Sequence, residues 1–552
     1  MLPILRMTGE QLQALMSDVF GKELMFELAR KYKVIQRQRC MDLIGFVLSL
    51  IFTGGTEECG RQYAVLSRYL ENGAPKVVRG AFYAWFTEPL EMLLSELLRR
   101  ALQVASTLPK LLPGILGTVS DWLVVDSSTV VLRHKLVEQW KGCGEYAALK
   151  IHKQWSVGLG NLVKYHLSPA RESDSKHLTV DASRRGTGLL VDLGYASHDL
   201  LRDCKTHNVK YVIRLKSDWK FRPIRLVVGR LNDQLGIDSS VEMKLSRETV
   251  MADDEFLDAD VEIGDPDKPR IHCRLIGVPT PKGYCLYLTN LSRDTHDASQ
   301  VGDLYRVRWE IEIDNKVDKT GAQLDRISAE TPVSVRILIL ASLLNATLAR
   351  IIVQRHKLEL YDSREINPVT QQPEITRPPL HPILMVKAMR VCASRVGAAL
   401  HSAAPSCAPV PIAPSTTKTE HHSSPTPAPS AVIPPSEATH HAPSDPSATT
   451  THRTPFLNEP RMSQSLPHKA TPTRAASPGQ DALDSSHAGR TQADPSLTTS
   501  LHEWDELIDL LVHMGHDPNW RRRPSVLDRL QGLVASPARP RKSKAVKCGI
   551  AN

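Results

Sequence analysis

Residues 1–118 carry apolar residues three and four positions apart, which predicts helices. Two examples are the stretches LQALMSDVFGKELMFELARKY and PLEMLLSELLRRAL. That spacing places apolar side chains on one face of an α-helix. Lysines and arginines punctuate the same region, so the predicted helical N-terminal domain has basic edges. Such edges suit contact with a polyanion, and an ordinary helical bundle with solvated charges is the alternative.

The pattern changes at residue 119, where strands are predicted. WLVVDSSTVVLRH is a β-branched run broken by Asp126, as in a buried strand. GLLVDLGY is a short apolar run that ends at Asp192; ASHDLLRDCKTHN then has helical spacing, and VKYVIRLK is again a strand. Strands followed by strand–helix–strand predict an α/β layered domain, whose first part spans residues 119–216.

Residues 217–300 are predicted to form a β-rich insertion. The strand candidates VEMKLS, DADVEIG, RIHCRLIGV and YCLYLTNL are separated by Asp, Gly and Pro. Helices return in residues 301–400, the predicted second part of the α/β domain, with Asp297 or Ser299 as the cap of the first one. SVRILILASLLNATLARIIVQRH predicts a core helix, because Arg336 and Arg350 bracket an apolar run below the length of a membrane span.

Residues 401–500 are rich in Pro, Ser, Thr, Ala and His and contain few large apolar residues. Such a segment buries too little surface to offset the entropy of ordering, so a disordered linker is predicted. Residues 501–552 are predicted to form a short helical segment, which begins at the amphipathic stretch LHEWDELIDLLVHMG and ends in a basic tail.

Composition narrows the class of protein. The chain has 552 residues, a formal net charge of +9 and 41% hydrophobic residues, so it can build packed cores and suits an anionic partner such as nucleic acid. None of its nine cysteines forms a CxxC pair, which argues against a zinc ribbon or a dense disulfide framework. The N-terminus does not have the pattern of a signal peptide. A soluble cytoplasmic protein without a membrane span is expected.

One predicted helix gathers unusual chemistry on a single face. At 100° per residue, about a third of its circumference would hold Tyr305, Arg308, Trp309, Glu312, Lys316 and Lys319. Glu310 and Asp314 would lie on the far side. This face offers cations for phosphates with one acid embedded among them. The alternative is a solvated face with the intrahelical pairs Arg308–Glu312 and Glu312–Lys316.

Two acids of the predicted strands extend this constellation. An aspartate inside an apolar strand, such as Asp126, is costly unless it is paired or binds a cation. Asp192, at a strand end, is more easily tolerated and has a helix cap as its alternative role. Together with Glu312 they form three carboxylates, which could hold two Mg²⁺ ions through oxygen ligands.

The spacing Tyr305–x2–Arg308–x3–Glu312–x6–Lys319 resembles, without a gap, the Y-(2)-R-(3)-E-(6)-K signature of the insertion sequence 4 family of DDE transposases. The segments around Asp126 and Asp192 resemble the first and second catalytic regions of that family. The resemblance implies a ribonuclease-H-like α/β catalytic domain with a β-rich insertion before the glutamate.

The same resemblance implies roles for the individual residues. Asp126, Asp192 and Glu312 correspond to the catalytic, metal-binding triad, with Mg²⁺ (Mn²⁺ as a substitute) and two ions per site. The signature positions other than Glu312 correspond to residues that grip the terminal phosphates and the cleaved strand: Tyr305, Arg308 and Lys319. We assign Trp309 and Lys316 to DNA contact as well, with a core role as the equal alternative for Trp309.

The expected protein is therefore a bacterial transposase that cuts DNA at the ends of its element and transfers the strand into target DNA. Its partners would be the terminal inverted repeats and target DNA, bound by a homodimer in the nucleoid, with residues 1–118 contacting the ends. Two alternatives stay open: a catalytically inactive DNA-end-binding protein or inhibitor, and a general nuclease that uses the same site.

Overall fold

The computed structural model describes most of the chain outside one long segment. The described residues are 7–35, 41–53, 61–215, 219–229, 243–244, 256–265, 267–280, 283–325, 327–369, 371–402, 495–520 and 524–534. Most of the predicted linker, the Arg521–Arg523 run and the basic tail lie outside them. The ends of the predicted 401–500 linker were misplaced, because the structure has residues 401–402 and 495–500 in helices.

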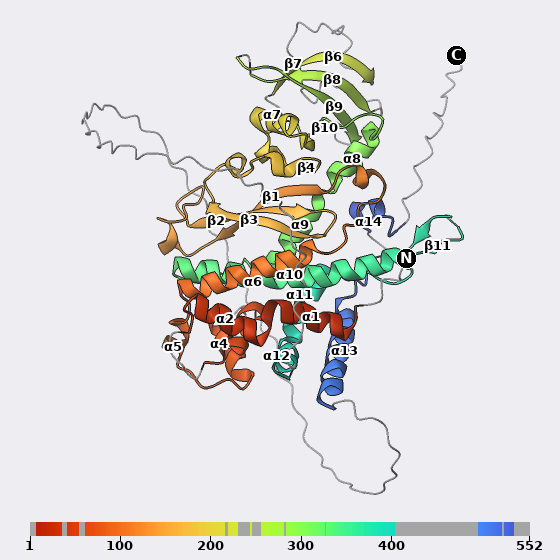
Figure 1. The fold of residues 1–552 in the computed structure, drawn as a ribbon. Coiled ribbons are helices and arrows are strands. Elements are labelled where there is room, and N and C mark those ends of the chain that lie inside the picture. Colours follow the sequence, from red (N-terminus) through yellow and green to blue (C-terminus); the bar gives the residue numbers. More distant parts are fainter. Residues whose placement is uncertain are drawn as a thin grey trace, which may run out of the picture. The chain divides into compact units, whose positions relative to one another are not determined.

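The N-terminal region is helical, and its apolar faces share one core with helices from the end of the chain (Figure 1). A capping box between Thr8 and Gln11 starts its first helix. Its described helices are α1 (Gly9–Phe20), α2 (Lys22–Lys31), α3 (Leu43–Phe52), α4 (Arg61–Glu71), α5 (Arg79–Tyr83) and α6 (Glu88–Ser106). They pack with α10 (Pro332–Asp362), α11 (Pro382–Val391), α12 (Ala393–Ser402) and α13 (Pro495–Gly515).

The predicted α/β alternation is confirmed in a mixed sheet. Its first strands are β1 (Trp122–Val131), β2 (Ala148–Ser156), β3 (Asn161–Pro169), β4 (Gly188–Val191) and β5 (Lys210–Arg214). They lie in the order β3-β2-β1-β4-β5, antiparallel from β3 to β1 and parallel from β1 to β5. The helix α7 (His198–Thr206), capped by Ser197, connects β4 to β5.

The described residues of the predicted insertion are mostly in strands, and these strands continue the same sheet. They are β6 (Lys220–Val228), β7 (Met243–Lys244), β8 (Leu257–Ile263), β9 (Ile271–Thr280) and β10 (Gly283–Thr289). Because β10 pairs antiparallel with β5, the ten strands form a single sheet that ends in the order β5-β10-β9-β8-β6-β7. The insertion is therefore rigidly joined through backbone hydrogen bonds to the strands that precede it.

The helix predicted around residue 310 is broken in the structure. α8 (Ala298–Arg306), which starts with an Asp297 capping box, and α9 (Trp309–Lys316) are separated by a tightened turn, and a π-helical turn (Val317–Gly321) follows. The break lets α8 contact β5 and β9 while α9 contacts β1. A single straight helix could not follow both parts of the twisted sheet.

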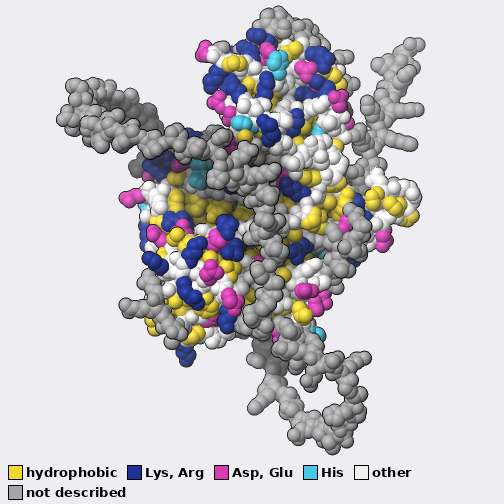
Figure 2. Space-filling model, in the orientation of Figure 1, with side chains coloured by type: hydrophobic (Ala, Val, Ile, Leu, Met, Phe, Trp, Pro, Cys, Tyr) yellow, Lys and Arg dark blue, Asp and Glu magenta, His cyan; other side chains and the backbone are white. Residues whose placement is uncertain are grey.

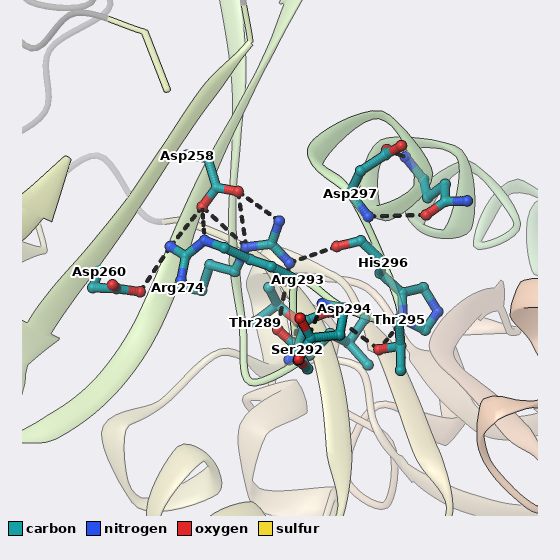
Figure 3. A network of polar contacts seen from close by, with 12 residues as sticks. Asp258, Asp260, Arg274, Thr289, Ser292, Arg293, Asp294, Thr295, His296 and Asp297 are labelled. Carbon is teal, nitrogen blue, oxygen red and sulfur yellow. Dashed lines mark hydrogen bonds and ion pairs between the residues drawn. The ribbon is translucent and has the colours of Figure 1, made fainter. Parts of the chain in front are cut away.

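A buried ionic network ties the insertion to the start of α8 (Figure 3). Arg274 on β9 donates to Asp258 on β8 (2.6 Å) and to the carbonyl of His296 (2.7 Å), next to the cap residue Asp297. Arg293 pairs with the same Asp258 at 2.8 Å. The network fixes the segment that leads into α8 relative to the sheet.

The apolar helix predicted for the core, α10, has 31 residues. It is long and apolar enough to cross a membrane, so the expectation that this run is too short was wrong. Its apolar window is entirely buried inside the protein, as predicted for a core helix. Arg350, which was expected to limit the run, is itself buried and paired with acids.

The remaining elements are short. They are the 3₁₀ turns at Gly114–Thr118, His134–Leu136, Asp174–His177, Ala182–Arg184 and Leu193–Tyr195, the hairpin of β11 (Glu365–Ile366) and β12 (Pro373–Glu374), and α14 (Val526–Leu530).

Candidate active site

Strand register places two of the predicted acids side by side. β1 and β4 are parallel neighbours with Val125 opposite Val191, so Asp126 and Asp192 follow at the same level. Burial raises the pKa of Asp126, and the nearby charge of Asp192 raises it further. Among the described residues, the Asp192 side chain makes no capping hydrogen bond to the turn that follows it. Its carboxylate is therefore not used as a helix cap.

The third acid, Glu312, is connected to Asp126 and Asp192 through the guanidinium of Arg308. Arg308 Nη2 lies 2.6 Å from Glu312 Oε1, which is the intrahelical pair expected under the structural alternative. Arg308 also interacts electrostatically with Asp126 and Asp192. Although burial opposes its charge, the pKa of Arg308 is raised by Tyr305, Asp192 and Glu312. All three predicted carboxylates thus share one cation.

Tyr305 connects α8 to the acids. Its hydroxyl donates to Asp192 Oδ1 at 3.5 Å, a long hydrogen bond, and its ring packs against Tyr287 with centroids 4.5 Å apart. Burial, with the charge of Asp192, raises the pKa of Tyr305 to about 12, while Arg308 opposes the rise. The phenol is therefore a neutral hydrogen-bond donor at ordinary pH.

The other predicted residues of this helix lie farther out. Trp309 is 56% exposed, which argues against its alternative core role, and the exposed Lys316 lies with its Nζ 6.0 Å from the Trp309 ring centroid. Lys319 is half-buried in the π-helical turn. Because a π-turn rotates less per residue than an α-helix, Lys319 is not on the face that an unbroken helix would give it.

A surface pocket of about 560 Å³ lies beside these residues. Its wall includes three aromatic rings, those of Tyr287, Tyr305 and Trp309, together with the guanidinium-bearing side chains of Arg306 and Arg308. Aromatic faces next to cations suit the bases and phosphates of a nucleic acid strand.

The structure adds Asn315 to the site, a residue that the sequence analysis did not single out. Its Nδ2 donates to Asp126 Oδ2 at 3.1 Å, and its Oδ1 is buried without a hydrogen-bond partner among the described residues. Asn315 lies three positions after Glu312, on the same side of α9. That spacing is the only signal in the sequence that could have pointed to it.

The acid expected on the far side of the helix faces a buried cluster. Asp314 lies 2.5 Å from Lys153 Nζ and 2.5 Å from Arg350 Nη2, and Asp318 pairs with the same two cations. Lys153 is the strand partner of Asp126 on β2. These charges were missed because their partners come from distant parts of the chain.

Three histidine rings stack on the other face of the sheet. His152 on β2 lies with its ring centroid 4.2 Å from that of His177, and His177 lies 5.1 Å from His166 on β3. The His152 Nδ1 is 3.0 Å from the hydroxyl of Tyr195, in the turn that follows Asp192. The stack thus supports the loop that carries the second acid.

No group of three acidic, histidine or cysteine side chains among the described residues is close enough to hold a metal ion in the arrangement seen. The chemistry of the site still fits a hard divalent cation. Its side chains are carboxylates with oxygen ligands, two of them adjacent, and the orphaned amide oxygen of Asn315 lies beside Asp126. Arg308 supplies the positive charge in this arrangement.

Comparison with known proteins points to one class. Residues 118–348 match the family described as the transposase DDE domain. The chain is 42% identical over 72 residues to the putative transposase InsL for insertion sequence element IS186A of Escherichia coli K12. This match covers 13% of this chain and 20% of that protein. It is equally similar over 72 residues to the transposase for insertion sequence element IS421 of Escherichia coli, covering 13% and 19%.

The chain therefore spans about a fifth of the length of the curated relatives it matches. The chain is also similar to the piggyBac transposase in a cryo-EM structure of its synaptic complex with hairpin DNA. The match covers 71% of this chain and 82% of that one, at 8% identity and a TM-score of 0.35. The sequence matches support a DDE transposase, with insertion sequence elements as the setting of its relatives.

Proposed function

We propose that the chain is a metal-dependent transposase of the insertion sequence 4 type, which cleaves DNA at its element's ends and transfers the strand into target DNA. The observation that carries the proposal is the shared position of Asp126, Asp192 and Glu312 around Arg308, whose own side chain lines a pocket together with aromatic rings. Arg308 thus connects the three acids to a pocket whose aromatic and cationic wall suits a nucleic acid strand.

Asp126, Asp192 and Glu312 are the residues that would hold the metal, which we propose to be two Mg²⁺ ions, or Mn²⁺ in their place. Bound there, the ions would activate the attacking oxygen and stabilise the leaving oxygen of a phosphodiester. The carboxylates must be ionised to do so. Arg308, which lowers the pKa of Asp126 against the effect of burial, favours that state.

The side chains around the acids would hold the DNA. Tyr305 and Arg308 offer donors next to Asp192 and Glu312, which suits the phosphate at the cleaved position. Lys319 would grip the cleaved strand, and the exposed Trp309 and Lys316 would contact bases or phosphates beyond it. Because DNA contacts by cations release counterions, binding should weaken steeply with salt.

A larger surface is available for the rest of the DNA. Figure 2 shows Lys and Arg side chains, with acids among them, over the insertion strands. Several of these cations are paired, such as Arg225 with Asp260 at 3.0 Å, so the insertion offers a mixed rather than a uniformly basic face. We propose that residues 1–118 add contacts to the element end and that a homodimer brings two ends together. The mixed sheet with its inserted strands supports a ribonuclease-H-like domain.

The test is cleavage of a DNA that carries the element's own ends, by the full chain with Mg²⁺ or Mn²⁺. Glu312→Gln removes one carboxylate charge without changing its size and should abolish cleavage while end binding survives. Asp303→Asn is the matched control, because Asp303 lies on α8 with its side chain 41% exposed and pairs only locally, with Arg306. It should cleave like the wild type.

Three other outcomes would overturn the proposal. End binding by the wild type without any metal-dependent product would indicate an inactive DNA-binding protein. Cleavage of arbitrary DNA without strand transfer would indicate a general nuclease. Full cleavage by Glu312→Gln would show that the acid assigned from the signature is not part of the site.

A further inference from the structure

The proposed site depends on holding a helix at a fixed distance from a strand. Glu312 comes from α9, whereas Asp126 comes from β1 and Asp192 follows β4. In α9, Ile311 packs fully buried against the sheet side, but the helix has only eight residues and little apolar surface. Such a short helix needs another attachment if its glutamate is to stay in place.

A closed ring of four buried charges provides that attachment. Lys153 from β2, Asp314 from α9, Asp318 from the π-helical turn and Arg350 from α10 each have side chains less than 5% exposed. Lys153 Nζ lies 2.5 Å from Asp314 and 2.8 Å from Asp318, and Arg350 Nη2 lies 2.5 Å and 2.7 Å from the same two acids. Each cation contacts both anions, and the two positive and two negative charges make the ring neutral.

Stability alone is a poor reason for such a ring. Four buried charges lose their hydration, and well-packed apolar residues often hold a core at least as well. What charges add is direction, because each ion pair works only at a short distance and in one geometry. A ring that joins β2, α9, the π-turn and α10 therefore fixes their relative positions more narrowly than apolar contacts would.

The ring also lies next to both proposed metal-binding elements. Lys153 is the register partner of Asp126, and Asp314 is two residues from Glu312. Between them, Asn315 of α9 donates directly to Asp126 at 3.1 Å. Any shift of the ring would therefore move Asp126 relative to Glu312.

We propose that Lys153, Asp314, Asp318 and Arg350, together with Asn315, are positioning residues that set the distance between Asp126 and Glu312 for cation binding. The inference rests on the proposed function of those acids. The ring would act only through the placement of α9, without itself binding DNA or cation.

The main variant removes one charge of each sign. Lys153→Met with Asp314→Leu keeps the core neutral, and the remaining pair of Asp318 and Arg350 stays satisfied. Loss of residues that orient metal ligands typically costs 10- to 100-fold in metal affinity or activity. We expect Mn²⁺ binding, measured by calorimetry on the full chain, to weaken about tenfold. The cleavage kcat should fall by about 10- to 100-fold while the KM for end DNA stays unchanged.

Two further variants separate positioning from general packing. Arg350→Lys should keep near-normal Mn²⁺ binding, because both acid contacts of Arg350 use the single atom Nη2, which a lysine ammonium can replace. The control is Lys357→Met with Asp528→Asn, which breaks a 2.9 Å ion pair between α10 and α14. The new asparagine keeps a side-chain oxygen that can accept the capping hydrogen bond of α14. It should lower the unfolding temperature without changing Mn²⁺ affinity.

Hydrogen exchange in α9 tests whether the ring holds this helix in place, independently of the proposed function. If the wild type neither binds Mn²⁺ nor cleaves DNA, the proposed function fails. Faster exchange of residues 309–321 in the Lys153→Met, Asp314→Leu protein alone would still support a ring that fixes α9. Unchanged exchange, or Mn²⁺ affinity equal to that of the wild type in the folded double variant, would overturn the inference.

Discussion

Glu310 should make the folded protein lose stability as the pH rises. Burial, with the charges of Asp528 and Asp314, raises the pKa of Glu310 to about 7 from an ordinary 4.5, although Lys357 opposes the rise. It lines a cavity of about 180 Å³ between α9, α10 and the segment before α14. Because the folded state holds this proton more tightly than the unfolded chain, the stabilisation is complete below about pH 4.5 and is lost as the pH rises through about 7.

The size of the effect follows from the two pKa values. A difference between 4.5 and about 7 corresponds to about 3 kcal/mol of folding free energy, as an upper value. Glu310→Gln keeps the shape and cannot ionise, so its free energy of unfolding should exceed that of the wild type by up to about 3 kcal/mol at pH 8.5 and by little at pH 4.5. Urea unfolding at both pH values measures this difference.

The control for that comparison is Glu138→Gln, which changes an exposed glutamate. Its difference from the wild type should be small and the same at both pH values. The reasoning about Glu310 is refuted if Glu310→Gln differs from the wild type by equal amounts at pH 4.5 and pH 8.5. That result would mean that folding does not change the pKa of Glu310.

Three other predictions test separate parts of the structure. Asp258→Ala leaves the buried Arg274 without its carboxylate and should cost about 3–5 kcal/mol in urea unfolding, more than loss of a surface pair would. Trp309→Ala should leave stability nearly unchanged, since the ring is 56% exposed, but should weaken end binding in a filter or anisotropy assay by about 1–3 kcal/mol if the ring stacks on a base. Burial, with nearby His177, lowers the pKa of His152 from 6.5 to about 4. Because the unfolded chain therefore binds a proton that the folded chain does not, stability should fall by up to about 3 kcal/mol as the pH drops from 6.5 to 4. His152→Gln should flatten this pH dependence in thermal unfolding.

Local patterns predicted most elements because they were set by neighbouring residues. The β-branched run around Asp126 and the apolar run before Asp192 became the strands β1 and β4, and the spacing of residues 198–206 became α7. The register that aligns the two acids was not predictable in the same way. It depends on β1 and β4 being parallel neighbours, which is a property of the whole sheet.

The broken helix shows where periodicity misled the prediction. Apolar and polar spacing around residue 310 fits one long helix, but the turn at Val307 and the π-turn at residues 317–321 change the rotation along it. Val307 is completely buried while Trp309 is exposed, so tertiary packing overrode the local pattern. Lys319 was displaced for that reason, although its spacing from Glu312 matches the signature.

The acids of α9 and the following turn bear on why we propose Glu312, and not a neighbouring acid, as a cation ligand. Four carboxylates occupy positions 310–318, and like charges so close would repel one another unless each were neutralised. Three of these acids are neutralised in the structure. Burial favours the protonated form of Glu310, and the two cations of the ring neutralise Asp314 and Asp318. Glu312 pairs instead with Arg308, four positions earlier. In the proposed function, Arg308 would turn to a phosphate and leave Glu312 free to bind a cation. The proposed role of Glu312 thus depends on how the other three acids are neutralised, which no count of charges along the sequence could reveal.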